Sequence, residues 1–129
     1  MIYYIACPCR KPRWFYEEAA KEYEKRLSRF CRVVRADHCD PGGEGDYVIG
    51  LSPDGAQLSS EDMANRFLSM ESRGAVSRII FVVEGNMSIH VDETWALISI
   101  RLPEDLTVVL LLEQIYRAQK ILHHEPYHK

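Results

Sequence analysis

RIIFVV, residues 78–83, is the clearest strand signal in this chain of 129 residues. Its unbroken run of β-branched and aromatic side chains is typical of a buried strand. Working outward from it, apolar stretches predict four more strands, at residues 2–6, 32–36, 47–51 and 95–100. The turn-forming residues that follow several of these stretches support short strands separated by loops.

Helical patterns separate the strands. A stripe of apolar residues at helical spacing predicts a first helix over residues 14–30. Ser59 and Asp62 have the spacing of a capping box, which predicts that a second helix begins there. Residues 106–122 predict a third, long helix that is apolar nearly all round in its first half. Such a helix needs cover on more than one side, from the sheet and from a partner subunit.

The alternation of strands and helices predicts one α/β domain over residues 1–129. We expect about five mainly parallel strands with helices on both faces of the sheet. Ligands of such sheets bind at the carboxyl ends of the strands. The loops after Leu51, Val83 and Ile100 are therefore the first places to look for a site.

Composition narrows the class of protein. Apolar residues make up 47% of the chain, enough for a substantial core. The longest apolar run is far shorter than the roughly 20 residues of a membrane helix. The N-terminal stretch lacks the positive region of a signal peptide. We therefore expect a cytoplasmic protein that does not enter the membrane.

Charge is unevenly distributed. The net charge is −3, yet residues 10–35 contain nine Lys and Arg against four Glu, and residues 36–72 contain eight acids against Arg66. The basic first quarter is open to two interpretations. It is either a surface that faces phosphates or an ordinary solvated helix face.

The four cysteines do not have the spacing of a zinc site. Cys7 and Cys9 form a C-x-C pair, and Cys31 and Cys39 stand apart from each other. His38 beside Cys39 leaves a metal site conceivable, but reduced, partly buried thiols are the favoured interpretation. We expect no metal.

The C-terminal segment carries a resemblance. Residues 111–118 read LLEQIYRA, and residues 125–129 read EPYHK. Together they resemble the ribosomal RNA large-subunit methyltransferase H family, whose last helix reads L-x-E-Q-x-Y-R-A and whose tail reads P-Y-H-K or P-Y-H-R. Weaker similarity covers most of the rest, including Trp14, residues 22–27 and residues 82–85.

This resemblance implies the SPOUT fold, with a C-terminal trefoil knot, in a homodimer. It implies that the knot binds S-adenosylmethionine. The methyl group would go to ring nitrogen N3 of a pseudouridine in large-subunit (23S) ribosomal RNA. The ribosome or its RNA would then be the partner.

Site residues follow from the same resemblance. His128 is the candidate base for the N3 proton, since histidine titrates near neutrality, and Tyr127 is a candidate to stack on the target base. Arg117 could hold a phosphate or brace the fold through Glu113. Without the resemblance, Tyr127 and His128 would be read as a frayed tail. The implied cofactor-binding residues are Leu51, Gly85, Leu97, Ile98, Ser99, Ile100, Arg101 and Leu102.

The chain departs from the family pattern in places. Residues 84–94 are shorter than the family's cofactor loop and contain one glycine, and residues 41–46 are shortened too. Glu104 and Val108 stand where the family has His and Arg. An alternative therefore stays open, a SPOUT homodimer that binds RNA or ribosomes without transferring a methyl group. A flavodoxin-like small-molecule binder would leave the tail unexplained.

Overall fold

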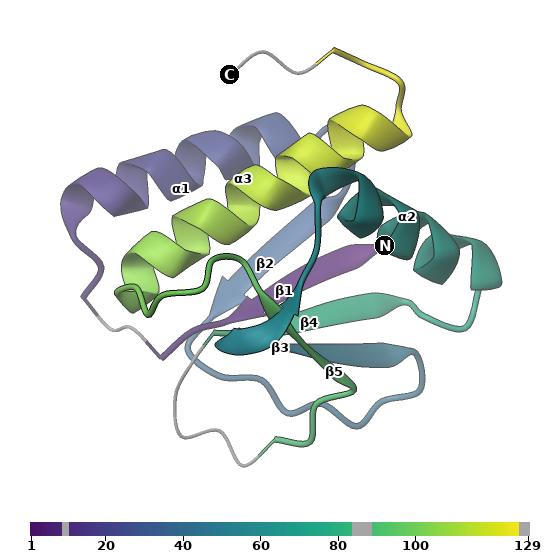
Figure 1. The fold of residues 1–129 in the computed structure, drawn as a ribbon, viewed down its shortest axis with the longest axis horizontal. Coiled ribbons are helices and arrows are strands. Elements are labelled where there is room, and N and C mark those ends of the chain that lie inside the picture. The colour runs from purple at the N-terminus through teal and green to yellow at the C-terminus, as the bar shows by residue number, and fades with distance from the viewer. Residues whose placement is uncertain (9–10, 84–88, 127–129) are drawn as a thin grey trace.

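The computed structural model describes residues 1–8, 11–83 and 89–126 (Figure 1). This part of the chain contains five strands and three helices, in the order β1-α1-β2-β3-α2-β4-β5-α3. The strands are β1 (Ile2–Ala6), β2 (Arg32–Ala36), β3 (Asp46–Gln57), β4 (Arg78–Val83) and β5 (Glu93–Ala96). The helices are α1 (Trp14–Leu27), α2 (Ser60–Arg73) and α3 (Glu104–Leu122).

The strands form one sheet in the order β2-β1-β4-β3-β5. Every pair of neighbours is parallel, which confirms the predicted α/β class and its parallel sheet. β4, the RIIFVV strand, lies at the centre, between β1 and β3. The carboxyl ends of the strands therefore share one edge, where the candidate site is expected.

β3 is longer than predicted because it pairs twice with β5. Leu51 lies opposite Trp95, and Ala56 lies opposite the same residue after a shift in register. Residues 52–55, predicted to end the strand, instead form an irregularity of the β-bulge kind within β3. The backbone of Thr94 and Trp95 passes so close to Gly55 that a Cβ there would lie 2.7–2.8 Å from it. Gly55 is therefore required by space at this crossing.

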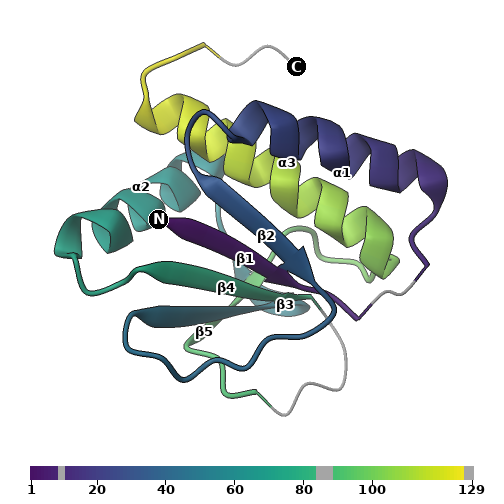
Figure 2. The same cartoon turned by 180° about the vertical axis from the view of Figure 1, so that it is seen from behind.

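All three helices of the described chain lie on the same side of the sheet. Figure 1 and the view from behind in Figure 2 both show α1, α2 and α3 on one side. Side chains from each helix share one core with that face of the sheet. The largest fully buried side chains of this core include Tyr3, Ile5, Phe67, Phe81, Trp95, Leu111, Leu112 and Ile115.

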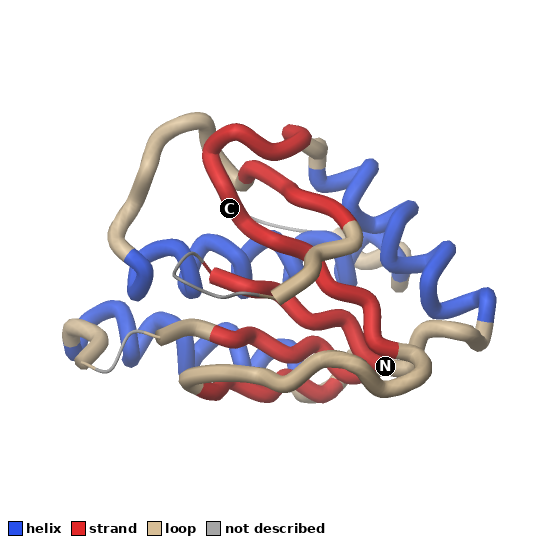
Figure 3. The backbone as a smooth tube through the Cα atoms, turned by 90° about the horizontal axis from the view of Figure 1, so that it is seen from below, coloured by secondary structure: helices blue, strands red, loops and turns tan. Residues whose placement is uncertain are grey.

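The prediction of helices on both faces of the sheet is therefore wrong. The lengths of the connections between strands explain why. Residues 37–45, between β2 and β3, span at most about 30 Å when extended, which leaves no length for a helix. The second face carries a small core of Ala6, Val48, Ile80 and Val82, covered by Cys39 and by residues 89–91. In Figure 3, seen from below, the strands lie in front of the helices.

Several element ends differ from their predicted positions. α2 begins as expected, since Ser59 and Asp62 form a complete capping box. α1 ends at Leu27, three residues before Phe30. β5 ends at Ala96, so residues 97–100 form bends and not a strand. Among the described residues, no helix has the length and apolarity needed to cross a membrane.

Candidate cofactor site

A pocket opens at the carboxyl end of β3, as the topology predicts. Its walls come from three places: the end of β3 with its turn, the segment after β5, and the first turns of α3. Most of the lining is apolar, with two hydroxyl groups. The lining residues are Leu51, Ser52, Pro53, Leu97, Ile98, Ile100, Leu102, Thr107 and Leu110.

Most of the residues expected to bind the cofactor meet here. Five of the eight line the pocket, namely Leu51, Leu97, Ile98, Ile100 and Leu102. Ser99 and Arg101 belong to the same segment but are exposed and lie outside the lining. Gly85 lies outside the described residues.

Sequence reasoning missed four lining residues. Ser52 and Pro53 follow Leu51 directly, so the strand-end rule could have found them. Thr107 and Leu110 lie three residues apart on α3, which places them on one helix face. The only sequence signal for Thr107 and Leu110 is the apolar character of the residues around them. That character is equally typical of a helix buried in the core.

The pocket is apolar and narrow. It holds about 30 Å³, room for little more than a water molecule. Residues 97–102 lie outside helix and strand, so their backbone N–H and C=O groups are not tied into a ladder. Ile98 and Ile100 are 42% and 60% exposed. The segment at the mouth of the pocket is therefore exposed and irregular.

An ion pair fixes the helix beside this segment. Arg13 donates from Nε and Nη2 to the two carboxylate oxygens of Asp105, both at 2.9 Å, and its backbone N–H donates to the same group at 3.0 Å. Asp105 is buried at the first turn of α3, and the backbone N–H of Leu106 also donates to it. Hydrogen bonding from Arg13 holds the pKa of Asp105 well below its ordinary value.

Asp105→Asn is expected to lower the free energy of unfolding at pH 7 by about 1–3 kcal/mol, because it removes a charged acceptor of several hydrogen bonds. The folded carboxylate has the lower pKa. Its stabilisation is therefore complete above the ordinary pKa of 3.8 and is lost as the pH falls below that value. The gap between wild type and variant should narrow from pH 5 towards pH 2. Urea titrations at several pH values measure it.

Asp46→Asn provides the matched control. Asp46 is also nearly buried and accepts two hydrogen bonds from one arginine, Arg78, at 2.9 and 2.7 Å, but at the amino ends of the strands. Both variants should lose stability, and only Asp105→Asn should weaken S-adenosylmethionine binding. Equal cofactor affinity in the two folded variants would contradict a role for Asp105 in shaping the pocket.

A second, larger cavity of about 390 Å³ lies on the other side of the first turns of α3. Arg35 lines it and pairs with Glu17 and Glu24, at 2.7 and 2.8 Å. Its lining also includes Tyr16 and Asp105. Among the described residues, no group of three or more metal-ligating side chains gathers, and the three cysteines seen are free thiols.

Arg117 and the start of the tail are held by carboxylates. Arg117 is mostly buried and donates to Glu113 at 3.0 Å, which is the bracing contact expected as one of its two roles. Glu125 pairs with Lys120 on α3 and with Arg29, just beyond α1. Tyr127 and His128 lie outside the described residues.

Comparison with known proteins agrees with this geometry. A family model described as "Predicted SPOUT methyltransferase" matches residues 39–128. A protein named Ribosomal RNA large subunit methyltransferase H 1, from Thermoanaerobacter sp. (strain X514), is 36% identical over 135 residues and covers 100% of both chains. The chain belongs to the SPOUT methyltransferases of the large-subunit methyltransferase H family.

Other members of the family align over longer stretches. The Bifidobacterium animalis subsp. lactis member is 32% identical over 156 residues, covering 97% of this chain and 98% of its own. The Acetivibrio thermocellus member is 30% identical over 146 residues, covering 89% and 91%. The Thermoanaerobacter alignment needs only 135 positions, so that member is short as well. The shortening of this chain therefore does not separate it from the family.

Proposed function

We propose that this protein transfers the methyl group of S-adenosylmethionine to ring nitrogen N3 of a pseudouridine in large-subunit ribosomal RNA, as a cytoplasmic homodimer. Family membership makes it a methyltransferase, and the names of its relatives point to ribosomal RNA. The observation that carries the proposal is the pocket where Leu51 meets residues 97–102. Segments far apart in the sequence build it at the strand ends, where the family resemblance puts the cofactor.

The residues of the pocket would bind and orient rather than react. Bound S-adenosylmethionine would supply an electrophilic methyl group on its sulfur. Leu51, Leu97 and Ile98 would hold the adenosyl group by apolar contact, and backbone groups of residues 97–102 would read its polar edge. Methyl transfer is an in-line displacement, so aligning the acceptor nitrogen supplies much of the rate enhancement. His128 would take the N3 proton.

A homodimer through α3 is supported by the exposure of its apolar residues. Val108, Leu111 and Leu112 are buried in the core of one chain. Val109 and Leu110 are only partly buried. Apolar side chains left half covered on a long helix suit a partner subunit.

Ile98→Trp is expected to weaken S-adenosylmethionine binding at least tenfold, because the larger ring would fill the narrow pocket. Ile98 is 42% exposed, so the fold should tolerate the change. Leu68→Trp, at a 50% exposed position on α2, is the control and should bind as wild type does. Isothermal titration gives both affinities. Unchanged binding by Ile98→Trp would place the cofactor elsewhere.

The whole proposal is tested by transfer of labelled methyl from S-adenosylmethionine to ribosomes that lack the modification. Incorporation at a pseudouridine, mapped on the isolated RNA, is the expected result. The second candidate is binding to RNA or ribosomes without methyl transfer. The narrow pocket favours it, as do Glu104 and Val108 at the positions of the family's His and Arg. That candidate would be established if the protein binds ribosomes but gives no heat in isothermal titration with S-adenosylmethionine.

A further inference from the structure

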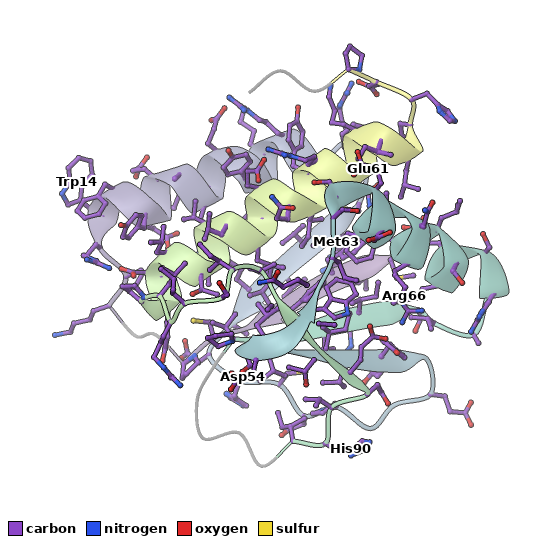
Figure 4. The ribbon with its side chains drawn as sticks, in the orientation of Figure 1. Trp14, Asp54, Glu61, Met63, Arg66 and His90 are labelled. Atoms are coloured by element: carbon purple, nitrogen blue, oxygen red, sulfur yellow. The ribbon has the colours of Figure 1, made fainter. Side chains whose placement is uncertain are left out.

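Three aromatic residues in a row begin α1, and two of them face solvent. Trp14 is 76% exposed and Phe15 is 45% exposed. Figure 4 shows Trp14 projecting away from the body of the molecule at the start of the helix. The rings contact one another edge to face, with centroids 5.7 Å apart for Trp14 and Phe15 and 4.6 Å apart for Phe15 and Tyr16. Grouped, exposed rings of this size mark an interaction surface.

Arg13 makes this cluster part of the fold. Its guanidinium lies 4.8 Å from the ring centroid of Tyr16 and 5.7 Å from that of Phe15. The same guanidinium forms the two hydrogen bonds to Asp105 on α3. The rings are thus tied to the helix that lines the cofactor pocket. A partner that stacks on them would meet a surface that is already ordered, which lowers the entropy cost of binding.

The charge around the rings identifies the kind of partner. Lys11 and Lys21 are exposed on either side of the cluster in the sequence. They belong to residues 10–35, which carry five more basic than acidic groups in a chain of net charge −3. Aromatic faces beside cations fit unpaired bases and their phosphates. A second copy that docked through the same face would bring its own Lys11 and Lys21, and like charges would oppose that contact.

We propose that Trp14 and Phe15 form a stacking platform for an unpaired base of the RNA substrate, outside the nucleotide that is methylated. This rests on the proposed function. Tyr16 and Arg13 support the platform from below, and Lys11 and Lys21 attract the phosphates. The platform contributes binding energy for RNA and takes no part in the chemistry.

The test compares Trp14→Ala/Phe15→Ala with Leu68→Ala, which removes a 50% exposed apolar side chain from α2. The platform variant should raise KM for unmodified large ribosomal subunits about tenfold or more. Its kcat, its affinity for S-adenosylmethionine and its thermal stability should stay close to wild type. Trp14→Phe keeps a ring and should retain most of the affinity. Leu68→Ala should change none of these values.

Fluorescence gives a second measurement. The other tryptophan, Trp95, is 1% exposed, so a single-stranded oligouridine probe should quench mainly Trp14. The quenching should disappear in Trp14→Phe. Wild-type emission that does not change at saturating oligouridine would overturn the platform.

The outcomes separate this inference from the proposed function. If the wild type is active and the platform variant has the same KM for ribosomal subunits, the platform is refuted and the proposed function is not. A platform variant that becomes monomeric in light scattering shows that a second copy covers the rings, and also refutes it. If the wild type neither binds RNA nor transfers a methyl group, both proposals are refuted.

Discussion

Gly55→Ala is expected to lower the free energy of unfolding by about 2–4 kcal/mol, at the upper end of what overpacking costs. A Cβ at Gly55 would lie 2.7 Å from the carbonyl carbon of Trp95 and 2.8 Å from that of Thr94. These are backbone atoms, which cannot rotate away as a side chain could. Either the turn over β5 opens or β5 shifts. For a chain of this size, a fall in Tm of roughly 10 °C is expected.

Gly43→Ala is the control for this prediction. The nearest atom to a Cβ at Gly43 is a side-chain oxygen of Asp46, 3.5 Å away, which is ordinary contact. Both variants restrict the unfolded chain equally, so their difference isolates the crossing. Denaturant titration of the two proteins, with m-values compared, makes the measurement. Equal stabilities would show that the close approach of β3 and β5 is absent in solution.

The same variant should also affect the cofactor pocket. Leu51, Ser52 and Pro53 form one wall and immediately precede the crossing at Gly55. Pushing the turn away from β5 would move that wall relative to Leu97. S-adenosylmethionine affinity should therefore fall in the folded fraction of Gly55→Ala.

Local pattern was enough to predict the strands and helices. β1, β2 and β4 begin and end at the predicted residues, because runs of β-branched and aromatic side chains mark them strongly. The carboxyl-end rule then led from Leu51 to the pocket. The capping box placed the start of α2, since its two hydrogen bonds depend only on residues three apart.

Long-range pairing could not be predicted in the same way. Residues 52–55 have the composition of a turn, but the structure keeps them within β3 as a bulge-like shift in register, after which the strand pairs with β5 again. The hydrophobic periodicity of a sequence does not indicate that a strand pairs a second time with a distant strand. Arg13 and Asp105 are 92 residues apart, and neither carries a local signal of the other. The trefoil knot likewise stays a prediction from family resemblance.

The one-sided arrangement of helices was missed because alternation says how many helices there are and not which face each covers. The length of the connections carries that information. Two crossovers, through α1 and α2, contain helices, whereas residues 37–45 are too few to add one. In the described chain, loops alone cover the second face of the sheet, which residues 37–45 cross. Its core around Ile80 is therefore smaller than the core under the helices.

Removing residues 126–129 is expected to reduce methyl transfer about a hundredfold or more, the loss expected when a general base is absent. Of residues 126–129 the structure describes Pro126, which belongs neither to the pocket lining nor to the core, so we expect fold, dimer and cofactor affinity to change little. Glu125, just before the tail, pairs with Arg29 and Lys120.

His128→Ala should account for much of this loss, and Tyr127→Ala should mainly raise KM for the ribosome. The difference in methyl-transfer rate between wild type and His128→Ala should become smaller at high pH. There the pseudouridine loses its N3 proton without a protein base. His90→Ala, which removes an exposed histidine from the second face of the sheet, is the control. Rates are measured by transfer of labelled methyl to ribosomes lacking the modification. If truncated and full-length proteins transfer methyl equally fast, the base is not on the tail, and the proton must leave through another group or directly to water.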